Sequence, residues 1–275
     1  MTTTPLTTSA RSDASGLADL GPLAQLRAGR LAVRLPLLVA GLYLYGASLA
    51  MMVRGSLGVA PWDVLHVGVA RYVPLTLGQT VIVLSFVVLL LWIPLRERPG
   101  LGTLANALLV GLSTDLTLGL LAAPAAWWAR AGLLAGGILL NAVATGLYIG
   151  SQFGRGPRDG LMTGLVRRTG LSVRVVRTSI EVTVVALGWL LGGPLGAGTV
   201  LYAVLIGPLV QVLLPRCTVR LPPPTGEPTT DRSALGGDQD GRVGGDHDLD
   251  GGEPLVGQPP LAQGVDPSLV DGGPR

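Results

Sequence analysis

The chain has 275 residues, of which 48% are hydrophobic and only 13% are charged, and its mean hydropathy is +0.53. These values exclude an ordinary soluble domain, and apolar runs of about 20 residues indicate several membrane-spanning helices. A single cysteine, Cys217, excludes an intrachain disulfide. Two histidines are too few for a dedicated zinc site, so we expect no metal and no cofactor.

Six apolar segments predict an all-α, polytopic membrane protein embedded in the lipid bilayer. They fall into a first membrane repeat, residues 35–123, and a second membrane repeat, residues 131–215. The predicted spans cover approximately residues 35–53, 75–95, 101–123, 131–150, 173–193 and 197–214.

The two ends of the chain have a different composition from the membrane repeats. Residues 1–34 are rich in Thr, Ser and Ala and lack the early apolar core of a cleaved signal peptide. Residues 216–275 are rich in Pro, Gly and Asp, and from residue 221 onward ten acidic residues stand against three arginines. We therefore expect a cytoplasmic N-terminal segment and a disordered acidic cytoplasmic tail.

One motif occurs twice in the chain, at Leu57–Arg71 and again 96 residues later at Phe153–Arg167. Proline and aspartate recur together under this offset, which chance would not align in a chain rich in Leu, Gly and Val. The repeats therefore indicate an internal duplication. The identical pairs include Gly58/Gly154, Pro61/Pro157, Asp63/Asp159, Gly68/Gly164, Arg71/Arg167, Gly100/Gly196, Gly102/Gly198 and Thr103/Thr199.

Each copy of the motif predicts a short helix after the first span of its repeat. Pro61 and Pro157 suit the first helical position, and Asp63 and Asp159 then lie in the first turn, where an acid complements the helix dipole. These helices, over about residues 61–72 and 157–169, are too short to cross about 30 Å of hydrocarbon. They must lie at the membrane interface or enter the membrane and return.

Arginine, which supplies all the basic residues of the chain, predicts the orientation. With both termini inside and short helices that do not cross, only Arg54, Arg71 and Arg130 lie outside. This bias predicts that both termini are cytoplasmic and makes the second repeat an inverted copy of the first. The cytoplasmic side then collects Arg27, Arg30, Arg34, Arg96, Arg98, Arg155, Arg158, Arg167, Arg168, Arg174, Arg177, Arg216 and Arg220.

Polar residues in or near the spans are the candidates for a pathway or ligand site, because charges are costly in a membrane. Asp63 and Asp159 are interpreted either as ligand or proton sites at the outer and inner mouths of a pathway, or as helix caps at the membrane surface. Arg177 and Glu181 are four residues apart, so they either contribute to a site or neutralise each other on one helix face.

The remaining candidates are His66, Asp115, Asn106 and Asn141. His66 is the one histidine in the membrane repeats; it either titrates beside Asp63 or is an interfacial residue with no role. Asp115 either accepts a proton or hydrogen-bonds a neighbouring helix.

The sequence contains none of the short motifs typical of zinc proteases, serine hydrolases or P-loop proteins, so we expect no enzyme and no catalytic residue. The leading interpretation is a transporter- or channel-like protein that moves a small solute or ion through a site between inverted repeats. The alternative is a non-transporting scaffold or accessory factor that acts through a partner membrane protein or a second copy of the chain. No nucleic-acid partner is expected.

Three ungapped stretches carry a resemblance to a known family: GSLGVAPWDVLHVGVAR, IPLRERPGLGTLANALLVGLSTD and GLYIGSQFGRGPRDGLMTGLVRRTG. Over about residues 35–214 the sequence resembles the YczE/YyaS/YitT group of bacterial integral membrane proteins, and within it the YczE branch. The resemblance implies a location in the bacterial plasma (inner) membrane and a transporter-like or membrane-associated role, and it supplies no ligand or catalytic residues.

Overall fold

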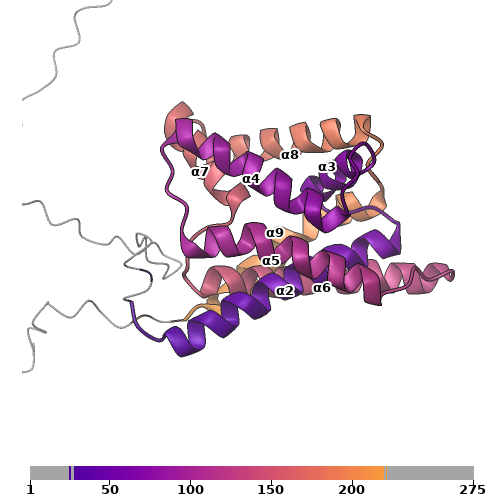
Figure 1. The fold of residues 1–275 in the computed structure, drawn as a ribbon, viewed down its shortest axis with the longest axis horizontal. Coiled ribbons are helices and arrows are strands. Elements are labelled where there is room, and N and C mark those ends of the chain that lie inside the picture. The colour runs from indigo at the N-terminus through magenta and orange to yellow at the C-terminus, as the bar shows by residue number, and fades with distance from the viewer. Residues whose placement is uncertain (1–24, 26–27, 220, 222–275) are drawn as a thin grey trace, which may run out of the picture. The chain divides into compact units, whose positions relative to one another are not determined.

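A computed structural model describes residues 25, 28–219 and 221, and this part of the chain contains helices joined by loops and no strand. The predicted acidic tail and most of the predicted N-terminal segment lie outside the described residues. The helices, labelled as in Figure 1, are α2 (Leu31–Gly55), α3 (Pro61–Ala70), α4 (Leu77–Leu95), α5 (Leu101–Leu120), α6 (Trp127–Gly150), α7 (Pro157–Thr169), α8 (Val173–Leu190) and α9 (Ala197–Cys217).

A long helix is present at each of the six predicted spans, and both short helices are present, so the prediction of a polytopic, all-α membrane protein is confirmed. Five of the long helices, α2, α4, α5, α6 and α9, are long and apolar enough to cross a membrane. The predicted fifth span, α8, does not meet this description because Arg174, Arg177 and Glu181 lie within its 18 residues. Helix α6 begins at Trp127, four residues before the predicted span of residues 131–150.

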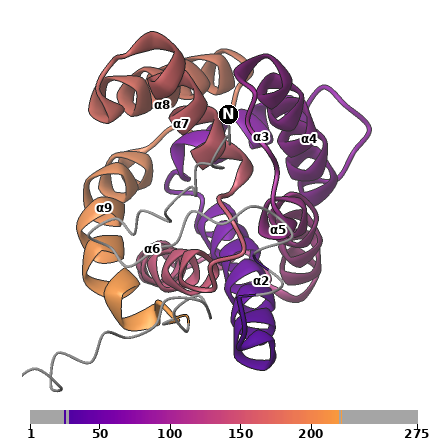
Figure 2. The ribbon, with the colours of Figure 1, turned by 90° about the vertical axis from the view of Figure 1, so that its left-hand side faces the viewer.

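The helices are arranged in two layers (Figure 1). In one layer α2 packs along both α5 and α6, and α6 packs along α9. The other layer contains the short helices α3 and α7, which lie between α4 and α8 (Figure 2). The contact between α4 and α5 joins the layers.

Each short helix packs against the other half of the chain. In sequence order α3 belongs with α2, α4 and α5, yet its main partner is α8, and α7 has α4 as its main partner in the same way. The close approach at both contacts requires glycine. A Cβ atom on Gly188 of α8 would lie 2.4 Å from the backbone nitrogen of Leu65, and one on Gly160 of α7 would lie 2.0 Å from the ring of Trp92.

The loops that precede the short helices repeat this exchange. The Leu57 carbonyl accepts a 2.8 Å hydrogen bond from the Gly198 amide at the start of α9. The Phe153 carbonyl accepts an equal 2.8 Å bond from the Gly102 amide at the start of α5. These donors and acceptors are equivalent under the 96-residue offset, so the two halves are connected by the same contact made twice.

The glycines after Leu57 and Phe153 allow the loops to turn into the short helices. Gly58 has φ +117° and Gly154 has φ +105°, in a region of backbone conformation that residues with a Cβ atom rarely adopt. A Cβ atom on Gly58 would also lie 2.8 Å from the amide nitrogen of Thr199. The duplicated glycines of the motif therefore have a backbone role.

One pair of equivalent helices breaks this correspondence. Helix α4 packs along α5, but α8 and α9, the corresponding pair, barely touch within the described region. The space between α8 and α9 is therefore wider than the equivalent space between α4 and α5.

Candidate functional site

The two short helices begin as the motif predicts, with Pro61 and Pro157 in their first turns. Asp63 and Asp159 also lie in the first turns, but neither residue is the N-cap, and neither N-cap residue donates or accepts a side-chain capping bond. Instead the two carboxylates contact side chains of other elements. The position of Asp63 is therefore tied to a contact between the two halves, and that of Asp159 to a contact within the second half.

Asp63 lies in a small buried network. Its side chain is within 3.0 Å of His66 Nδ1 and 3.6 Å of the guanidinium of Arg158, which comes from α7. His66 is 1% exposed, and this burial lowers its pKa, so the imidazole is neutral near pH 7 and Nδ1–H donates to the carboxylate. Helix α3 is too short to span the membrane, and here it brings Asp63 to an arginine of the opposite half.

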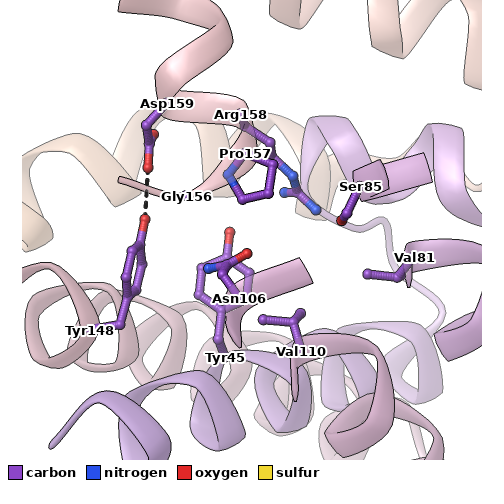
Figure 3. A pocket seen from close by; sticks show the side chains of 10 residues that line it. All are labelled: Tyr45, Val81, Ser85, Asn106, Val110, Tyr148, Gly156, Pro157, Arg158 and Asp159. Carbon is purple, nitrogen blue, oxygen red and sulfur yellow. Dashed lines mark hydrogen bonds between the residues drawn. The ribbon is translucent and has the colours of Figure 1, made fainter. Parts of the chain in front are cut away.

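Asp159 has a different partner, the hydroxyl of Tyr148 in α6. This hydroxyl donates a 2.8 Å hydrogen bond to one carboxylate oxygen (Figure 3). The preceding residue, Arg158, turns away from Asp159, and its guanidinium lies 5.2 Å from the centre of the Trp62 ring. Asp63 therefore approaches Arg158, the residue that precedes Asp159 in the chain, whereas Asp159 itself binds Tyr148.

A cavity of about 290 Å³ lies between α8 and α9 and extends to the starts of α3 and α7. Its wall combines aromatic rings with two arginines and two carboxylates. The aromatic residues are Tyr45, Trp62, Tyr148 and Tyr202, and the charged residues are Arg158, Asp159, Arg177 and Glu181.

A second cavity, of about 40 Å³, lies beside α4, α5 and the start of α7 (Figure 3). Four residues, Tyr45, Tyr148, Arg158 and Asp159, line both cavities and so lie between them.

The two cavities occupy equivalent places in the two halves. Seven of the ten residues that line the small cavity have a counterpart 96 residues away that lines the large one. These pairs are Val81/Arg177, Ser85/Glu181, Asn106/Tyr202, Val110/Ile206, Gly156/Ala60, Pro157/Pro61 and Arg158/Trp62.

The other candidates from the sequence lie in three places. Arg177 and Glu181 are paired at 3.0 Å on the wall of the large cavity, and Asn106 lines the small one. Asn141 is buried; its amide donates to Ser48 and its carbonyl accepts from Tyr202, both at 2.8 Å.

Asp115 lies away from both cavities and joins two helices. Its carboxylate accepts a 2.7 Å bond from the Gly78 amide and a bond from the Thr76 hydroxyl, both at the start of α4. The structure therefore has Asp115 hydrogen-bonding a neighbouring helix.

The sequence did not single out the tyrosines of the cavity, and it counted Arg34 and Arg158 among the arginines of the cytoplasmic side. In the structure both side chains turn into the protein. Arg34 is fully buried, with hydrogen bonds to the carbonyls of Ser151 and Gln152, and Arg158 is only 22% exposed between the cavities. Counting charged residues at the ends of spans cannot distinguish an arginine that faces solvent from one whose side chain turns into the protein. Within the described residues no group of His, Cys, Asp and Glu could hold a metal ion.

These features define a polytopic α-helical membrane protein whose two halves exchange short helices around polar cavities. Residues 32–215 match a family of unknown function, DUF6198, and the chain belongs to this YczE-type family of bacterial membrane proteins.

Three relatives illustrate the family. An uncharacterized protein of Haemophilus influenzae is 42% identical over 68% of this chain and 85% of its own. The uncharacterized membrane protein YczE of Bacillus subtilis is 32% identical over 64% and 83%, and the uncharacterized protein YyaS of the same organism is 28% identical over 64% and 89%. No solved structure matches the chain significantly.

Proposed function

We propose that this protein moves a small solute across the bacterial plasma membrane, through a pathway between its two halves. The observation that supports this most directly is the pair of equivalent cavities, one of about 290 Å³ and the other of about 40 Å³. Transporters built from inverted repeats expose a central site to one side and then to the other by exchanging the conformations of the repeats. Equivalent cavities of unequal size are what such a protein has in one of its two states.

The proposed topology places the large cavity toward the cytoplasm. With the N-terminus inside, the end of α6, the start of α8 and the second half of α9 lie on the cytoplasmic side. Residues of these segments line the large cavity, among them Ile149, Arg177 and Gln211. The small cavity is lined by Val81 and Ser85, in the half of α4 that faces outward in this topology.

Alternating access then has a simple geometric form. In the present state α4 and α5 are packed together while α8 and α9 are apart. In the second state α8 and α9 close and α4 separates from α5, so that the small cavity enlarges toward the outside.

Cysteine accessibility tests this pathway without knowledge of the solute. In a variant that carries Cys217→Ser, we would introduce Gln211→Cys in the large cavity or Ser85→Cys in the small one. The control is Val204→Cys, because the Val204 side chain is apolar and 65% exposed on the outside of α9. A charged, membrane-impermeant thiol reagent is then applied to intact cells and to inverted vesicles.

The expected result is labelling of Gln211→Cys from the cytoplasmic side, slower labelling of Ser85→Cys from outside, and no labelling of Val204→Cys from either side. If neither cavity position reacts with the charged reagent, no aqueous pathway exists, and the non-transporting scaffold becomes the better interpretation. If both react only from the same side, the inverted topology is wrong.

A further inference from the structure

The four residues shared by both cavities point to the class of solute, an inference that rests on the proposed function. Any solute that passes from one cavity to the other must pass Tyr45, Tyr148, Arg158 and Asp159, because these residues line both. They supply one cation, one anion and two phenolic rings. The charges of the site are thus opposite in sign and carried by neighbouring residues.

Arg158 has N–H donors available for an anionic group. A guanidinium carries five such donors. Its nearest carboxylate in the described chain is that of Asp63, at 3.6 Å, which is longer than a hydrogen bond, and Asp63 already accepts from His66. The Trp62 ring covers the guanidinium at 5.2 Å, which orients the plane of the group and leaves its edge for a carboxylate.

Asp159 has the matching capacity for a cationic group. One carboxylate oxygen accepts the hydrogen bond from Tyr148, and a carboxylate has about four lone-pair sites in all. Unlike Asp63, it forms no ion pair with an arginine or histidine of the described residues. Its charge is therefore balanced less directly than that of Asp63.

The two groups are directed to opposite sides of the pocket. In Figure 3 the guanidinium of Arg158 extends toward Ser85, whereas the carboxylate of Asp159 extends toward Tyr148, and Tyr45 and Asn106 lie below the helix start between them. A solute that touches both must carry its two charges at separate ends. The aromatic rings of the larger cavity would contact its apolar body.

We propose that the protein binds a small zwitterion, such as an amino acid or a betaine, with its anionic group on Arg158 and its cationic group on Asp159. A solute with a single charge would remove water from both Arg158 and Asp159 but would form an ion pair with only one of them, so the other charge would be left without water or a partner, which is unfavourable. A zwitterion forms an ion pair with both residues. The larger cavity, at about 290 Å³, is near the lower limit of ligand pockets and suits a small solute.

The test uses the purified full-length protein in nanodiscs, with binding measured by calorimetry. The probes are glycine, alanine and glycine betaine as zwitterions, acetate as the anion alone and ethylammonium as the cation alone. At least one zwitterion should bind, and acetate and ethylammonium should bind about tenfold or more weakly, since each lacks one charged hydrogen-bonding partner.

Three variants separate the roles of the charges. Arg158→Gln and Asp159→Asn should each weaken zwitterion binding by about tenfold to a hundredfold, and Asp159→Asn should remove the preference for zwitterions over acetate. Arg167→Gln is the control, because Arg167 is 60% exposed and paired with Glu97 at 3.0 Å, away from the cavities. It should leave binding unchanged.

The zwitterion proposal is overturned if none of the three zwitterions binds, if acetate or ethylammonium binds as well as they do, or if Arg158→Gln and Asp159→Asn bind like the wild type. These failures are distinguishable from failure of the proposed function. Side-specific cysteine labelling without zwitterion binding would keep the pathway and refute only this solute class.

Discussion

Substituting Gly188 by alanine tests whether the exchange of short helices holds the protein together. The new Cβ atom would lie 2.4 Å from the backbone nitrogen of Leu65 and 2.5 Å from the carbonyl carbon of Val64. Ordinary contact requires about 3.5 Å or more, so α3 and α8 must separate by about 1 Å. Backbone atoms have no rotamer with which to avoid the clash.

We expect Gly188→Ala to destabilise the protein by about 2–3 kcal/mol, toward the upper end of the usual range for overpacking. Gly160→Ala at the equivalent contact should be milder although its Cβ atom would lie only 2.0 Å from Trp92, because that neighbour is a side chain. The Trp92 ring can turn, at the loss of its 3.0 Å hydrogen bond to the Pro157 carbonyl, worth about 1 kcal/mol.

Thermal unfolding in detergent, followed by the fluorescence of a thiol-reactive dye that reports exposure of Cys217, measures these effects. The matched control is Gly132→Ala in α6, where nothing lies within 4 Å of the new Cβ atom and alanine should stabilise the helix by up to about 1 kcal/mol. If Gly188→Ala is as stable as Gly132→Ala, the close contact between α3 and α8 does not exist.

Three further variants test other parts of the structure by the same unfolding assay. Gly58→Ala should cost about 1–3 kcal/mol, because the φ of +117° is strained for any residue with a Cβ atom. Arg34→Met should cost about 1–3 kcal/mol, because it removes the guanidinium donor from the buried carbonyl of Ser151. The wild type should lose stability as the pH falls below about 6.5, because burial lowers the pKa of His66 and the unfolded chain then binds the proton more tightly; His66→Gln should lack this loss.

Each of these expectations has a result that contradicts it. A Gly58→Ala variant of wild-type stability would mean that the loop is not held in this conformation. An Arg34→Met variant that is unchanged would mean that the arginine is solvated. Equal acid sensitivity of the wild type and His66→Gln would assign the pH dependence to another group.

The helices and their order could be predicted because they depend on local patterns. The effect of a long apolar run, of a proline at the first helical position or of an acid two residues later depends only on the residues next to it in the sequence. These patterns predicted α7 over residues 157–169, as the structure has it, and the start of α3 at Pro61, although α3 ends at Ala70 rather than near residue 72. The charged residues of α8 did not prevent its prediction, since Arg177 and Glu181 interrupt an otherwise apolar segment.

The partners of these helices could not be predicted, because they depend on contacts between distant residues. The duplication made Gly102 and Gly198 visible as a repeated feature, but only the structure shows that their amides bind the carbonyls of Phe153 and Leu57 in the opposite half. Arg158 was assigned by its position near a span end, and its burial follows from how α7 packs on α4. The candidate site is built from such contacts between distant residues. The sequence therefore identified several residues of the site but not how they are arranged.

The exchange of short helices also sets the order in which the protein can mature. When only the first half, helices α2 through α5, has been inserted into the membrane, α3 has no α8 to pack against. The Leu57 carbonyl then also lacks the Gly198 amide as a donor. The first half must therefore remain unfinished in the bilayer until the second half has been translated and inserted. Only after that insertion can α3 pack against α8 and α7 against α4.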